Sequence, residues 1–77
     1  MGGEKLPVLT ARELLSILKH LGFEKVHQRG SHLMLRRASD RRHVTIPIHP
    51  GRTLKKGLLK GILKDTGLTV EELNRLR

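Results

Sequence analysis

Histidine and arginine are the residues of this chain whose spacing best suits acid–base chemistry. The segment Arg29-Gly30-Ser31-His32 predicts a tight hairpin turn, because Gly30 can take a positive φ without steric cost. A histidine titrates near neutrality and can donate or accept a proton. An arginine can hold a phosphate through two parallel hydrogen bonds. His32 is therefore the candidate catalytic residue and Arg36 a candidate accessory residue, although a histidine on a strand is more often an ordinary surface residue.

Two further histidines are candidate accessory residues. His27 is expected opposite His32 across the turn, and His49 follows Pro47 where a later strand ends. For His27 the alternative is a simple surface residue, and for His49 it is a hydrogen bond that fixes a turn. These histidines lack cysteine or carboxylate partners at zinc-ligand spacing, so we expect no metal site and no cofactor.

Net charge is the strongest compositional signal. Sixteen Lys and Arg against seven Asp and Glu give a formal charge of +9 on 77 residues. Such an excess favours a polyanionic partner, most often a nucleic acid, over a merely solubilising surface. Phe23 is the single aromatic residue, which argues against a platform of stacked bases.

The length and composition predict one small domain over residues 1–77, with residues 1–9 as a flexible leader. There are no cysteines, which suits a reducing cytoplasm. We expect no association with a membrane, because no apolar run approaches the length of a membrane span.

The periodicity predicts the order α-β-β-β-α with a short extra helix. The first helix is expected at residues 11–21 behind a Thr10–Glu13 capping box, and strands are expected at 23–28, 31–37 and 43–48. The second helix is expected from the N-cap Thr53 to Thr66, and the last at 70–76 behind a second capping box. Two leucine-rich helices need an apolar surface, so we predict an α+β two-layer sandwich with a three-stranded antiparallel sheet and helices on one face.

Strand alternation sorts the side chains of this sheet into two faces. If Arg29 and Gly30 form the loop, His27 pairs with His32 and Val26 with Leu33. The second and third strands are expected to pair Leu35 with Val44, Leu33 with Ile46 and His32 with Pro47. The face expected under the helices comprises Val26, Leu33, Leu35, Val44, Ile46 and Ile48. The face expected in solvent comprises His27, His32, Met34, Arg36, His43 and Thr45.

The expected RNA-binding residues come from the turn and the second helix. They are Arg29, Ser31, Lys55, Lys56, Lys60 and Lys64. The last three recur every four residues and form one stripe, which could equally be an ordinary solvated helix face.

Three segments resemble the HicA mRNA interferase toxins: Gly30-Ser31-His32, VTIPIH at residues 44–49 and LKKGLLKGIL at residues 54–63. The resemblance runs from about Thr10 to Leu73. It implies a double-stranded-RNA-binding-domain-like fold, a toxin that cleaves mRNA, and neutralisation by a HicB-like antitoxin. It also implies that His32 is the catalytic histidine.

The leading hypothesis is a metal-independent endoribonuclease toxin of a type II toxin–antitoxin system, whose antitoxin covers the His32 face. The alternative is a non-catalytic double-stranded-RNA-binding module with the same fold and charge. A third possibility is an interaction protein whose solvent face only docks a partner.

Overall fold

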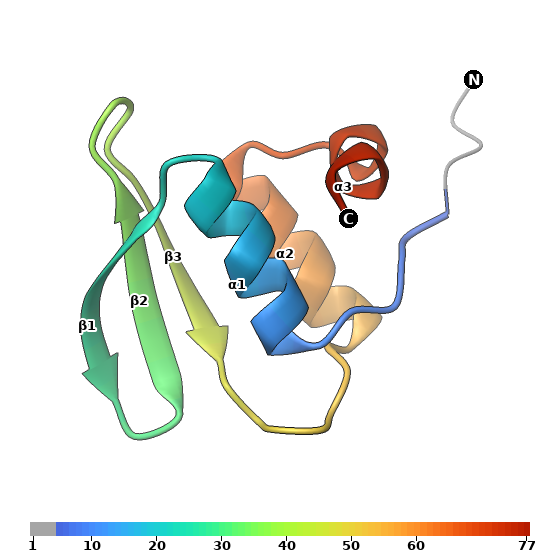
Figure 1. Ribbon diagram of the computed structural model, residues 1–77, viewed down its shortest axis with the longest axis horizontal. Coiled ribbons are helices and arrows are strands. Elements are labelled where there is room, and N and C mark those ends of the chain that lie inside the picture. The colour runs from blue at the N-terminus through green and yellow to red at the C-terminus, as the bar shows by residue number, and fades with distance from the viewer. Residues whose placement is uncertain (1–4) are drawn as a thin grey trace.

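The computed structural model describes residues 5–77 (Figure 1). Its elements are α1 (Ala11–His20), β1 (Glu24–Arg29), β2 (His32–Arg37), β3 (Arg42–Pro47), α2 (Lys56–Thr66) and α3 (Val70–Leu76). Figure 1 shows α1 and α2 lying over one face of the sheet, with α3 on their far side. The observed order confirms the predicted α+β sandwich with its short additional helix.

The three strands form one antiparallel sheet in the order β1-β2-β3. The pairing of β2 with β3 follows the predicted register: Leu35 lies opposite Val44, Leu33 opposite Ile46 and His32 opposite Pro47. An edge position suits β3, since Pro47 has no N–H to donate to a further strand.

The predicted register between β1 and β2 was wrong, because the partner of His32 lies two residues further along β1 than predicted, at Arg29 instead of His27. Arg29 lies opposite His32 and Gln28 opposite Leu33, so the loop is Gly30-Ser31. This register puts Gly30, with φ of 59°, at the first loop position, where a two-residue hairpin needs a positive φ. As a result His27 faces Met34 across the strands instead of His32.

An irregularity in β1 also overturns the expected core position of Val26. The register shifts between Lys25 and His27, as in a β-bulge, and leaves Val26 without a partner. Val26 is 53% exposed, while Phe23, just before the strand, is 1% exposed. Phe23 therefore fills the core beneath this end of the sheet, and Val26 does not.

The helix ends follow the predicted signals with one exception. Both capping boxes are confirmed: Glu13 N donates to Thr10 Oγ1 at 3.2 Å, and Glu72 N donates to Thr69 Oγ1 at 3.1 Å. Thr53 is not the N-cap of α2, which begins at Lys56 after Lys55 without a side-chain cap. Thr53 instead pairs with Thr10 in an isolated antiparallel bridge.

The expected leader is described only from Lys5 onward, and residues 1–4 lie outside the described part. Leu9 is buried in the core, and its carbonyl accepts a 2.7 Å hydrogen bond from Leu54 N. The carbonyl of Lys5 accepts a hydrogen bond from Asn74 Nδ2 at 3.0 Å. Residues 5–9 therefore pack against the body of the domain.

Arg37 links the C-terminal ends of α1 and α2 to the loop between β2 and β3. Its guanidinium lies 4.6 Å from the centre of the Phe23 ring, and it donates hydrogen bonds to the carbonyls of Leu21 and Thr66. It also forms two bonds to Asp40, at 3.1 and 2.7 Å. The guanidinium of Arg37, helped by the backbone N–H and charge of Arg42, lowers the pKa of Asp40 to about 2.

Candidate functional site

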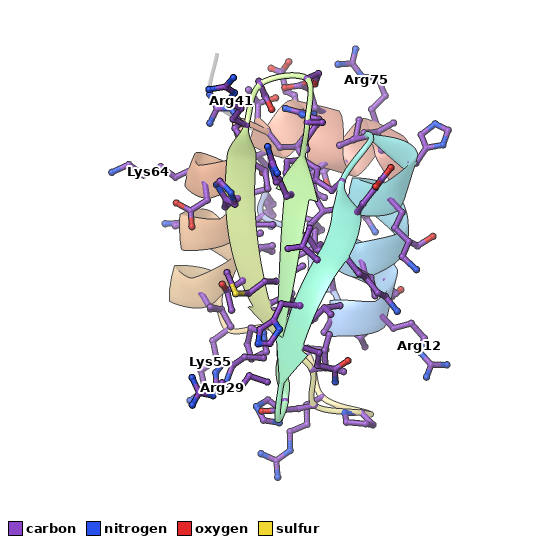
Figure 2. The ribbon with its side chains drawn as sticks, turned by 90° about the vertical axis from the view of Figure 1, so that its left-hand side faces the viewer. Arg12, Arg29, Arg41, Lys55, Lys64 and Arg75 are labelled. Atoms are coloured by element: carbon purple, nitrogen blue, oxygen red, sulfur yellow. The ribbon has the colours of Figure 1, made fainter. Side chains whose placement is uncertain are left out.

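The face of the sheet away from the helices, here called the open face, is arranged in three cross-strand rows. The turn row contains Arg29, His32 and Pro47, the middle row His27, Met34 and Thr45, and the far row Glu24, Arg36 and His43. All of these are exposed except the half-buried Pro47. The residues expected in solvent therefore share one accessible surface, as predicted (Figure 2).

His32 lies in the turn row with Arg29 on one side and Pro47 on the other. Directly opposite residues in an antiparallel pair have Cβ atoms about 4.5–5.5 Å apart. His27 lies one row away on β1 and is the diagonal neighbour of His32, at about 7–8 Å. The cation closest to His32 in the sheet is thus Arg29, and the expected direct histidine pair is not formed.

Arg36 lies well away from His32 along the same strand. Four residues along β2 separate the two, which corresponds to about 13 Å. Arg36 lies opposite Glu24 and His43 in the far row. Of the two arginines, Arg29 is therefore better placed to share one small anion with His32.

The chain beyond β3 brings His49 to the same end of the sheet. Ile48 N donates to the Ser31 carbonyl at 2.6 Å, which ties this segment to the hairpin loop. His49 then lines a hollow together with Pro47 and Lys55. Figure 2 shows Arg29 and Lys55 at this end of the sheet and Arg41 at the opposite end.

The lysines of α2 do not all lie with His32. Lys56 and Lys60 line a separate hollow with Lys5, Leu6 and Val70, on the side of α2 that faces the N-terminal segment and α3. Lys64 projects sideways from α2 beyond the β3 edge (Figure 2). The structure therefore brings Arg29, Ser31, His32, His49 and Lys55 to one end and places the other three lysines elsewhere.

Sequence reasoning missed two residues beside His49. Arg52 and Leu58 line the same hollow as Pro47 and Lys55. Arg52 follows the turn His49-Pro50-Gly51, so its closeness to His49 in sequence was an available signal. Leu58 lies on α2 and is 39% exposed, unlike the buried Leu59 and Ile62 of the same helix.

Two features of residues 5–77 bear on cofactors and membranes. Within that range, no group of three or more His, Asp or Glu side chains is arranged to hold a metal ion. No helix in the same range is long and apolar enough to cross a membrane.

One family model matches this sequence, that of the HicA toxin of bacterial toxin–antitoxin systems, over residues 11–68. The chain belongs to the HicA toxin family. The match includes α1, the whole sheet and α2, and it therefore contains the turn row and His49. No curated protein matches the chain. Membership of the HicA family supports a toxin function and implies a partner antitoxin.

Proposed function

We propose that this HicA toxin is an endoribonuclease that cleaves mRNA without a metal ion and so blocks translation, with His32 as its catalytic residue. The observation that carries the proposal is the turn row, in which an exposed histidine lies directly beside Arg29, with Lys55 at the same end of the sheet. A proton carrier next to a phosphate-binding cation is what RNA cleavage by the neighbouring hydroxyl requires.

In this reaction the 2′-oxygen of a ribose attacks the adjacent phosphorus. A base removes the 2′-OH proton as the new P–O2′ bond forms. An acid gives a proton to the 5′-oxygen as the P–O5′ bond breaks, and the products carry a 2′,3′-cyclic phosphate and a 5′-hydroxyl. His32 performs one of the two proton transfers, which typically contributes about 10²–10⁴-fold to the rate.

The second proton carrier is one of two histidines. His49 reaches this end of the sheet through the hydrogen bond between Ile48 N and the Ser31 carbonyl, and His27 is the diagonal neighbour of His32. Arg29 is the nearest phosphate ligand, while Arg36 is placed for a phosphate further along the strand.

The remaining cations hold the RNA backbone. Lys55 lies at the same end of the sheet as His32, and Lys56, Lys60 and Lys64 extend the positive surface around α2. The hydroxyl of Ser31, next to His32 in the chain, adds a neutral hydrogen-bond donor. Phosphate contacts carry little sequence information, so cleavage should depend weakly on sequence. The partner is a HicB-like antitoxin that covers the open face, and both proteins act in the cytoplasm.

The test is to incubate the purified toxin with a labelled RNA in the presence of EDTA and to identify the product ends. The proposal predicts cleavage with a 2′,3′-cyclic phosphate, and no cleavage of an oligonucleotide that lacks 2′-hydroxyls. A requirement for added metal would contradict the mechanism. RNA binding without any strand scission would instead favour the non-catalytic double-stranded-RNA-binding module.

A further inference from the structure

The hollow beside the turn row, here called the β3-end hollow, is lined by both apolar and cationic side chains. Its cavity volume is about 280 Å³. The lining residues are Ala11, Pro47, His49, Arg52, Thr53, Leu54, Lys55 and Leu58. Among the residues that the structure describes, no Asp or Glu lines it. The hollow therefore suits a ligand that has both a flat apolar part and a negative charge.

We propose that the β3-end hollow binds one unpaired base of the RNA, that of a nucleotide next to the phosphate held at His32. Proteins stack unpaired bases on aromatic side chains, histidine included, and hold flipped-out bases between aromatic and apolar side chains. Here the walls are Pro47, the exposed part of Leu58 and the imidazole of His49. The charges of Arg52 and Lys55 complement the phosphate that the same nucleotide carries.

The position of the hollow determines which nucleotide it takes. Pro47 lines the hollow and is also the direct cross-strand neighbour of His32. A strand whose phosphate lies at His32 and Arg29 can therefore reach the hollow with the adjacent nucleotide. This part of the inference rests on the proposed function, but the binding of a base does not require that the RNA be cut.

Leu58→Ala is the variant that tests the hollow, and Leu76→Ala is its matched control. Leu58 is 39% exposed and Leu76, on α3, is 38% exposed, so the two truncations to alanine remove equal side chains from equally accessible sites. Neither changes the charge of the protein. Leu76 does not line the hollow, so Leu76→Ala reports the effect of losing an exposed leucine alone.

The experiment uses the His32→Ala chain, which keeps the RNA intact, and a labelled single-stranded RNA. Affinity is measured for this RNA and for a set in which each nucleotide in turn lacks its base. We expect one position at which base removal weakens binding by about fivefold, the low end of base stacking on a protein side chain. This loss should disappear when Leu58→Ala is added and persist when Leu76→Ala is added.

Equal affinity for every RNA in the set would overturn the inference, as would the same behaviour of the Leu58 and Leu76 variants. The experiment also distinguishes a failure of this inference from a failure of the proposed function. If the base-dependent binding is present but the wild-type protein cuts no RNA, the base site stands and the nuclease proposal fails. If the wild-type protein cuts RNA and no position is base-dependent, the reverse holds.

Discussion

His32 is accessible because its neighbours on β2 are not. Leu33 and Leu35 are buried beneath the helices, and strand alternation turns His32, Met34 and Arg36 to the opposite face. The same alternation on β3 buries Val44 and leaves Thr45 exposed. The exposure of this histidine thus follows from burial of the leucines beside it.

For single residues, the register between β1 and β2 predicts unequal roles for the two arginines of the open face, Arg29 and Arg36. Arg29→Ala should lower kcat/KM for RNA cleavage by about tenfold or more, because on the proposed function it removes the charge-assisted hydrogen bond that Arg29 donates to the RNA phosphate beside His32. Arg36→Ala removes the same charge about 13 Å away and should have a clearly smaller effect. Steady-state cleavage of one labelled RNA by the two variants measures this difference. Equal losses would mean that both effects come from net charge alone.

Among the elements, the sheet shows what the sequence could and could not predict. The pairing of β2 with β3 was predictable, because Leu33 and Leu35 alternate in phase with Val44 and Ile46. The pairing of β1 with β2 was not, because either Arg29-Gly30 or Gly30-Ser31 puts a glycine in the loop, and the β-bulge beyond His27 then changes the phase of alternation again. One signal of the bulge is that Phe23 and Val26, three residues apart, cannot share one face of a regular strand.

The candidate site was predictable to a similar extent. The turn, the exposed face and His32 follow from local pattern and from resemblance. The separation of Lys56 and Lys60 from His32 does not, because it depends on how α2 is rotated against α3 and the N-terminal segment. The hollow that Arg52 shares with His49 was also not predictable, because residues 48–55 form a loop without helical or strand periodicity.

The bulge in β1 predicts different costs for one substitution at two valines. Val26→Thr should change the free energy of unfolding by less than about 0.5 kcal/mol, since Val26 is largely exposed. Val44→Thr should cost about 1–3 kcal/mol, because it buries a hydroxyl in the core. Both residues are β-branched before and after the change, so strand propensity is matched. Urea unfolding gives both values, and similar costs would contradict the assigned register.

The loop between β2 and β3 predicts a pH-dependent contribution to stability. Folding lowers the pKa of Asp40 from 3.8 to about 2, chiefly through its hydrogen bonds to Arg37. A carboxyl whose pKa is lowered by folding stabilises the protein above its unfolded pKa, and this stabilisation is lost as the pH falls through the folded value. Asp40→Asn should therefore be less stable than wild type at neutral pH, and the difference should shrink between about pH 4 and pH 2. Unfolding midpoints measured across this range test it, and a constant difference would contradict the assigned role of Asp40.

At the scale of the molecule, most of the Lys and Arg side chains in the described residues form no ion pair within the protein. Within residues 5–77, the two ion pairs both involve Asp40, which contacts Arg37 and Arg42 at the end of the sheet away from the turn row. The cations near His32 are therefore available to an external polyanion, and a net charge of +9 strengthens that attraction over the whole surface.

Salt dependence tests which of these cations contact RNA. Each phosphate contact with a single strand contributes about 0.7 to the slope of log K against log salt. Lys55→Gln should lower the magnitude of this slope by about that amount, since Lys55 lines the β3-end hollow. Lys19→Gln is the control, because Lys19 lies in the last turn of α1, at the other end of the molecule. Dissociation constants over a salt series give both slopes, and identical slopes would remove Lys55 from the interface.

The most direct test of the account compares His32 with a second exposed histidine of the open face. Wild type, His32→Ala and His43→Ala are assayed for cleavage of one labelled RNA in EDTA, with RNA affinity measured in parallel. We predict that His32→Ala loses cleavage by roughly 10²–10⁴-fold at unchanged affinity, while His43→Ala, in the far row, retains it. Cleavage by His32→Ala at the wild-type rate, or equal losses in the two variants, would contradict the claim that catalysis is performed by the histidine of the turn row.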